Sequence, residues 1–152
     1  MLKSIEGNFD NLEVNELLTK HFIELRAASP EGSAHVLDIP GLKVSSIKFW
    51  SLWDGEKLIG CGALKFLDKE HGEFKSIRIH DNFRKQGQGI NVINHLINEA
   101  KKLNIKRISI ETGAGDFFIP ARKLFKRTGF SECEPFAHYK VDINSVYLTK
   151  KI

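Results

Sequence analysis

Arg84-Lys85-Gln86-Gly87-Gln88-Gly89 is the stretch of sequence that decides how this chain folds. A strand pattern with alternating apolar side chains, Glu73 to Ile79, leads into it, and apolar residues at helical spacing follow it from Ile90 to Leu103. The sequence therefore predicts a strand, a glycine-rich loop and a helix in immediate succession.

This order predicts an anion site at the start of the helix. The first turn of a helix carries unpaired backbone N–H groups and the positive end of the helix dipole, which suit a phosphate. Gly87 and Gly89 have no Cβ, so a ligand can approach the backbone closely, and Arg84 and Lys85 add positive charge. The P-loop pattern GxxxxGK[ST] is absent, and Val92 stands where the dinucleotide-binding GxGxxG pattern needs its third glycine. An ordinary glycine-containing turn with surface charges is the alternative interpretation.

Two motifs of the chain resemble those of the GNAT superfamily of N-acetyltransferases. Arg84-x-x-Gly87-x-Gly89 resembles the R/Q-x-x-G-x-G/A loop, which in that family cradles the pyrophosphate of acetyl-CoA. The segment Ala121–Phe130 resembles the family's A-x-x-L-Y-x-x-x-G-F helix. Both motifs occur in the family's order, and with the surrounding strands the resemblance covers most of the chain. It implies an enzyme that transfers the acetyl group of acetyl-CoA to a primary amine by direct attack in a ternary complex.

Periodic patterns elsewhere complete the expected fold. Strands are expected within residues 1–9 and at 47–53, 57–66, 73–79, 107–111, 130–135 and 146–149, and helices at 14–28, 88–103 and 117–128. The order β-α-β-β-β-α-β-α-β-β predicts an α/β (α+β) fold with helices on both faces of the sheet. The resemblance implies a mixed, largely antiparallel sheet. Gly60 and Gly62 within one strand predict a bulge or the close approach of another backbone.

Length and composition predict one cytoplasmic domain, residues 1–152. Of the 152 residues 41% are hydrophobic and 28% are charged, as in an ordinary globular domain with its own core. There is no run of about 18 apolar residues to span a membrane, and the N-terminus lacks the apolar centre of a signal peptide. Cys61 and Cys133 have no CxxC neighbour or metal-ligand spacing, which favours a reduced protein. The net charge of +4 suits an anionic ligand; it would also suit nucleic acid, but no interleaving of aromatic and basic residues favours that.

The resemblance implies a set of contacts to acetyl-CoA. The strand end Ile77-Arg78-Ile79 would pair with the pantetheine arm, and one of its backbone N–H groups would polarise the thioester carbonyl. The expected cofactor-binding residues are Ile77, Arg78, Ile79, Arg84, Lys85, Gln86, Gly87, Gln88, Gly89, Ile90, Phe118, Arg122 and Phe125. Acetyl-CoA is thus the expected co-substrate, with a small-molecule or peptide amine as acceptor. No metal, nucleic acid or membrane partner is expected, and a homodimer would be in keeping with the superfamily.

Two positions depart from the family pattern. Phe125 stands where many members have a tyrosine that can protonate the CoA thiolate, so the general acid would have to be water or another residue. Phe118 stands where several relatives have an asparagine that bonds the CoA arm, so its contact would be apolar. The missing tyrosine keeps an alternative function open, a catalytically inactive acyl-CoA-binding or sensor module.

Glu73 is the expected catalytic residue, because it resembles the strand glutamate that serves as general base in histone-type members. Partial burial would raise its pKa toward neutrality; the alternative is a strand carboxylate paired with a lysine. Glu111, on the neighbouring strand, is the rival base or a contact for a cationic acceptor. His35 and Asp38, in the long segment after the first helix, and Tyr139 are the other candidates for binding the acceptor.

Overall fold

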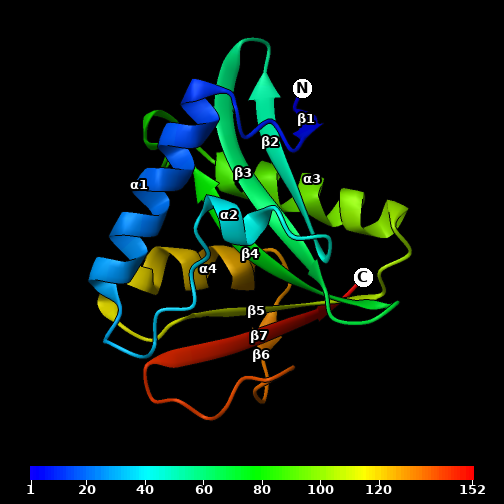
Figure 1. Cartoon of the computed structure of the whole chain (residues 1–152). Helices are drawn as coiled ribbons and strands as arrows, with labels where there is room; N and C mark the ends of the chain where they lie inside the picture. The colour runs from blue at the N-terminus through cyan, green and yellow to red at the C-terminus, as the bar shows by residue number, and fades with distance from the viewer.

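The computed structural model describes all residues of the chain, Met1 to Ile152, and contains a mixed seven-stranded sheet (Figure 1). Its strands are β1 (Lys3–Glu6), β2 (Ile47–Asp54), β3 (Lys57–Phe66), β4 (His71–Ile79), β5 (Arg107–Gly113), β6 (Ser131–Glu132) and β7 (Ser145–Lys151). The helices are α1 (Leu12–Ala28), α2 (Ile39–Leu42), α3 (Gln88–Lys102) and α4 (Ile119–Arg127), with single 3-10 turns η1 (Asp81–Phe83) and η2 (Asp116–Phe118). The strand order is β1-β2-β3-β4-β5-β7-β6, and only β4 and β5 pair in parallel. None of the helices has the length and apolar character needed to cross a membrane.

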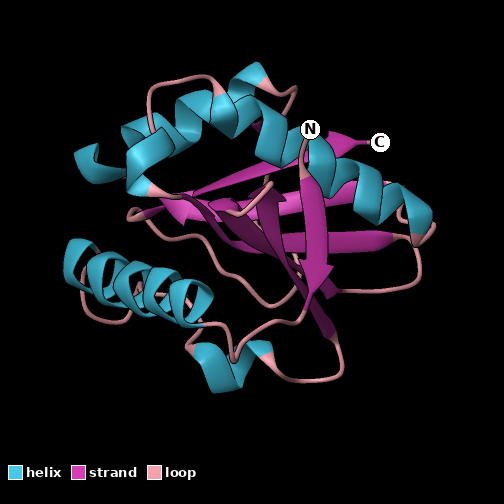
Figure 2. Ribbon diagram, turned by 90° about the horizontal axis from the view of Figure 1, so that it is seen from above, coloured by secondary structure: helices cyan, strands magenta, loops and turns pink.

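Helices cover both faces of the sheet, which confirms the predicted fold class. Figure 2 shows α1 and α2 on one side of the strands and α3 and α4 on the other. Strand β2 explains how both faces become buried, because its side chains alternate between them. Phe49 packs into a smaller hydrophobic cluster with α1 and α2, whereas Trp50 and Leu52 belong to the larger cluster beneath α3 and α4.

The parallel pair β4/β5 opens part-way along its length. Its register runs from His71↔Arg107 to Glu73↔Ser109 and stops there, although both strands continue. Figure 1 shows the two strands diverging toward the side on which α1 lies. Since β3 and β7 hold the outer edges of these strands, the gap lies within the sheet.

A bulge in β4 lies beside this gap. Cys61 pairs with Arg78 and Ala63 with Lys75, so two residues of β4 stand opposite Gly62 alone. One of them, Ser76, has a positive φ of 53°. The bulge therefore lies on β4, not on the glycine-containing strand β3. The glycines allow the predicted close approach: a Cβ at Gly60 would lie 2.5 Å from the Arg78 carbonyl oxygen.

We predict that Gly60→Ala destabilises the fold, because the added methyl group meets a main-chain oxygen that cannot rotate away. The expected loss is about 1–3 kcal/mol of unfolding free energy, measured by urea denaturation. Gly115→Ala is the matched control, since a Cβ at Gly115 meets nothing within 4 Å. Equal urea midpoints for the two variants would contradict the close approach.

Candidate active site

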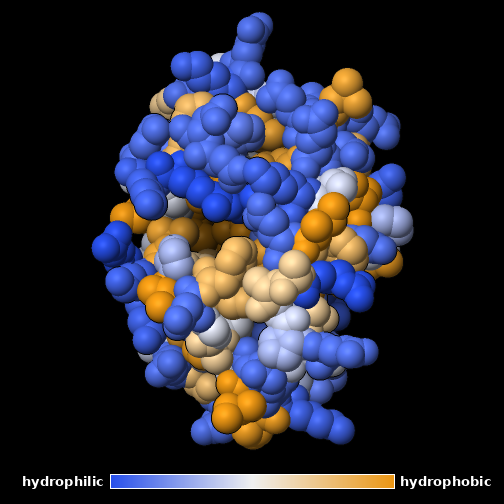
Figure 3. All heavy atoms as spheres, turned by 90° about the vertical axis from the view of Figure 1, so that its left-hand side faces the viewer, coloured by the Kyte–Doolittle hydropathy of each residue, from blue (hydrophilic) through white to orange (hydrophobic).

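A cavity of about 600 Å³ occupies the gap between β4 and β5. Its walls come from these two strands, from α1 and the segment after it, from the loop before α3, and from α4. Figure 3 looks onto this side of the molecule and shows a hollow with hydrophobic residues inside and hydrophilic residues along its upper rim. The interior can therefore hold an apolar chain, while charged groups meet the ends of a ligand.

The glycine-rich loop forms one end of the cavity. Gly87 is the N-cap of α3 with φ 79°, and no side chain caps the helix, so its first N–H groups are free for a ligand. Gly89 packs on α4, where a Cβ would lie 2.9 Å from Leu124. The loop residues that line the cavity are Arg84, Lys85, Gly87, Gly89 and Ile90. Gln86 and Gln88 do not line it; their side chains bond to the Asn82 carbonyl and the Asn91 amide.

Basic side chains of α4 add positive charge at this end of the cavity, but Arg122, the residue of α4 predicted to do so, is not among them. Arg122 donates two hydrogen bonds to main-chain oxygens at the end of β5 and just beyond it, Gly113 at 2.6 Å and Gly115 at 2.9 Å, and does not line the cavity. Lys123 and Arg127 line it instead. Their spacing of four residues on one helix face was the signal available in the sequence.

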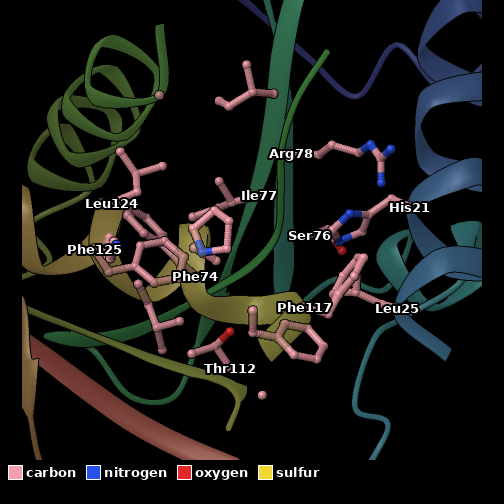
Figure 4. Close-up of a pocket in the computed structure, with 18 of the residues that line it drawn as sticks. His21, Leu25, Phe74, Ser76, Ile77, Arg78, Thr112, Phe117, Leu124 and Phe125 are labelled. Atoms are coloured by element: carbon pink, nitrogen blue, oxygen red, sulfur yellow. The ribbon is translucent and has the colours of Figure 1, made fainter. Parts of the chain in front are cut away.

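The bulged end of β4 forms the middle wall. Figure 4 shows Ile77 on the side of Phe125 and α4, and Arg78 pointing the other way, toward α1. The Arg78 guanidinium is 2.9 Å from a Glu24 oxygen and 3.2 Å from an Asp81 oxygen. Phe118, Phe125 and Ile79 also line the cavity. The serine of the bulge contributes a buried hydroxyl with no hydrogen-bond partner in the protein, a group that the sequence reasoning missed.

Glu111 and His35 line the cavity away from the loop, because the ionisable groups that act on Glu111 are His35, Lys75 and Glu73 and none belongs to the loop or to α4. Glu111 accepts a hydrogen bond of 2.8 Å from the Ser145 hydroxyl, and burial raises the pKa of its carboxyl. Asp38 is not part of this end: its side chain accepts from the Gly41 N–H and caps α2. The segment after α1 therefore reaches the cavity through residues 29–36 and not through Asp38.

Glu73 lies beside the cavity and not on its wall. Its side chain is 1% exposed, and its Oε2 accepts a 2.6 Å hydrogen bond from the Tyr139 hydroxyl and lies 3.4 Å from the Lys75 ammonium. This is the lysine-paired carboxylate that the sequence left open as the alternative to a general base. Burial, followed by the charge of Glu73, raises the pKa of Tyr139, so this hydroxyl stays protonated. Lys75 itself reaches the cavity wall.

His21 of α1 also lines the cavity. It is 6% exposed, and burial together with the Arg78 and Arg84 charges lowers its pKa from 6.5 to about 3. Its imidazole is therefore neutral at physiological pH.

Several known proteins are similar to this chain in sequence or in fold. Residues 13–130 match the acetyltransferase (GNAT) family. The chain is 45% identical over 140 residues to the uncharacterized N-acetyltransferase YsnE of Bacillus subtilis (strain 168), covering 92% of this chain and 93% of that protein. It is 38% identical over 136 residues to the uncharacterized N-acetyltransferase YedL of Escherichia coli (strain K12), covering 90% and 86%. A Bacillus subtilis acetyltransferase solved in complex with CoA superposes with a TM-score of 0.72 at 21% identity, covering 100% of this chain and 99% of that one.

We predict that His21 makes the fold acid-sensitive. Its pKa is lower in the folded chain than in the unfolded one, so its stabilising contribution is complete above pH 6.5 and is lost as pH falls toward about 3. Urea unfolding at a series of pH values is expected to show a loss on the order of a few kcal/mol over this window. In a plot of unfolding free energy against pH, His21→Gln is expected to remove the part of the slope that is due to His21 and to keep the part that is due to carboxylates. Parallel pH curves for the two proteins would contradict the prediction.

Proposed function

Because the chain belongs to the acetyltransferase (GNAT) family, we propose that it transfers the acetyl group of acetyl-CoA to a primary amine by direct attack in a ternary complex. One observation carries this proposal: a single cavity joins an uncapped helix N-terminus at one end to the Glu111 carboxylate at the other. Such a cavity suits a long anionic co-substrate and a cationic acceptor placed end to end.

The first turn of α3 is the proposed pyrophosphate site. The N–H groups that follow Gly87 would donate to the phosphate oxygens, and Arg84, Lys85, Lys123 and Arg127 would balance their charge. A hydrogen bond holds Arg84 in place, because its Nε donates to the Ile79 carbonyl oxygen at 3.3 Å.

The free edge of β4 is the proposed site of the pantetheine arm. Backbone groups of Ile77 and Ile79 have lost a neighbour on the β5 side, and buried amides need hydrogen-bond partners. The orphan Ser76 hydroxyl supports a ligand here for the same reason. Phe118 and Phe125 would give the arm an apolar wall.

Glu111 is the proposed general base, because it is the carboxylate on the cavity wall and because burial raises its pKa, which makes the carboxylate a stronger base than an exposed glutamate. The ammonium proton would pass to Glu111 first, and the neutral amine nitrogen would then bond to the acetyl carbon as the C–S bond breaks. Phe125 has no proton to give, so the second proton that the nitrogen loses would pass through water to the departing thiolate. In this scheme Glu73 orders Lys75 and Tyr139 and does not touch the amine.

We predict that Gly87→Trp abolishes binding of acetyl-CoA, measured by calorimetric titration, because the indole would fill the space in front of the helix N-terminus. Gly55→Trp is the matched control: both glycines have positive φ, 79° and 61°, and open space around a Cβ, but Gly55 lies in the β2–β3 turn. Binding is expected in the wild type and in the control. No binding by the folded wild type would sink the acetyltransferase proposal.

We predict that Glu111→Gln lowers kcat roughly 10²- to 10⁴-fold with a small amine while acetyl-CoA still binds. As pH is lowered, the wild-type rate is expected to fall once Glu111 becomes protonated. Because burial raises the pKa of Glu111, this fall begins at a higher pH than it would for an exposed glutamate, and the Glu111→Gln variant does not show it. Thiol release across a pH series measures both. The same loss in Glu73→Gln, with Glu111→Gln active, would move the base to Glu73. Acetyl-CoA binding without turnover of any amine would favour the sensor module.

A further inference from the structure

The acceptor end of the cavity carries the Glu111 carboxylate and has no lysine or arginine free to bind a carboxylate group of a ligand. Glu111 is the only carboxylate among the residues that line the cavity. Lysine and arginine are the side chains that would hold a carboxylate group of an acceptor. Each of those that line the cavity is either paired with acids of the protein or belongs to the loop end.

Lys75 is the lysine nearest to this end, and Glu73 neutralises it. The ammonium lies 3.4 Å from Glu73 Oε2 and 3.2 Å from the Tyr139 hydroxyl, and the lysine side chain is 10% exposed. Glu73 is buried and has no other cation beside it. An acceptor carboxylate at Lys75 would therefore compete with the buried Glu73 carboxylate for one ammonium group, and the two like charges would repel each other.

Arg78 is compensated twice over. Its two terminal nitrogens pair with Glu24 at 2.9 Å and Asp81 at 3.2 Å, and Figure 4 shows the side chain turned toward α1. The remaining lining cations belong to the glycine-rich loop and α4: Arg84, Lys85, Lys123 and Arg127. These serve the co-substrate phosphates in the proposed function, at the other end of the cavity.

Two loops tie together over the acceptor end. The Ser33 hydroxyl donates to Asp142 at 2.7 Å and accepts from the Asn144 amide at 3.4 Å, which joins the segment after α1 to the segment before β7. The next residue, Ser145, donates to Glu111. These hydrogen bonds hold the two segments together beside Glu111. Leu25, Val36 and Phe117 supply apolar surface to the cavity.

We propose that the acceptor is a small primary amine with an apolar body whose ammonium is its only charge, and that amino acids are excluded by their carboxylate. The ammonium would neutralise Glu111, and the apolar body would contact Leu25 and Phe117. The Glu73–Lys75 pair acts as a specificity element, because it makes the one nearby lysine unavailable to a carboxylate. This inference rests on the proposed function and narrows its substrate class.

The test compares substrates that share a body and differ in the carboxylate. Isoamylamine, leucinamide and leucine form one such set, and phenethylamine and phenylalanine form a second. With wild-type enzyme and acetyl-CoA, thiol release is expected to give kcat/KM values at least roughly 100-fold higher for each amine than for its amino acid. Leucinamide is expected to follow isoamylamine, since the amide carries no negative charge.

A single isosteric change should shift this preference. Glu73→Gln frees Lys75 from its counter-ion, so the ratio of kcat/KM for leucine to that for isoamylamine is expected to rise by roughly 10-fold or more. Glu99→Gln is the matched control, because Glu99 also pairs with a lysine, at 3.2 Å from Lys102, but lies on α3 away from the cavity. The control should keep the wild-type ratio.

The outcomes separate the two proposals. Wild-type turnover of leucine or phenylalanine equal to or above that of the matched amine would overturn the exclusion of amino acids and leave the acetyltransferase proposal standing. This comparison needs no variant, so it holds even if Glu73→Gln fails to fold. Acetyl-CoA binding without turnover of any amine, amide or amino acid would overturn the proposed function and this inference with it.

Discussion

The end of pairing between β4 and β5 is the constraint on which the rest of the structure depends. Beyond Glu73 and Ser109 the two parallel strands no longer pair with each other, while β3 on one side and β7 on the other keep them in the sheet. Backbone groups freed inside a protein need new partners. The opened sheet therefore creates both the cavity and a strand edge whose backbone groups are free on the β5 side.

Packing around the bulge keeps this gap open. The extra residue in β4 requires β3 to approach closely, and Gly60 and Gly62 permit that approach because they lack side chains. On one side of the gap Arg78 anchors β4 to α1 through Glu24. On the other side Arg122 anchors the end of β5 to α4 through main-chain oxygens. Each strand is thus fastened to a different helix, which stabilises their separation.

Charge is sorted along the cavity in a way that follows from the same architecture. The loop end combines the α3 N-terminus with arginine and lysine side chains. The other end has Glu111 and a lysine, Lys75, whose charge is neutralised by Glu73. Opposite ends of one site therefore prefer opposite charges. A co-substrate and an acceptor of opposite charge would each be oriented by this field before any reaction between them.

The order of strands and helices, the glycine-rich loop and the two-sided core could be predicted from the sequence, because periodicity and turn residues are local signals. The same holds for the loop residues Arg84, Lys85, Gly87 and Gly89 and for the aromatic wall at Phe118 and Phe125, all of which line the cavity. A resemblance in two motifs was enough to indicate the family, since both motifs are continuous in the chain.

Only the tertiary structure decided which side chains reach the cavity. Asp38 caps a helix, Arg122 binds main-chain oxygens and Glu73 is buried behind the wall, although their residue types and positions in sequence suited a site. These outcomes depend on a one-residue bulge in β4 and on contacts such as Tyr139 with Glu73, which join residues 66 positions apart. The sequence by itself therefore determined the order of elements and the glycine-rich loop before α3, because their signals are local in the chain. The acceptor end was decided by register and by long-range contacts, which no local pattern encodes.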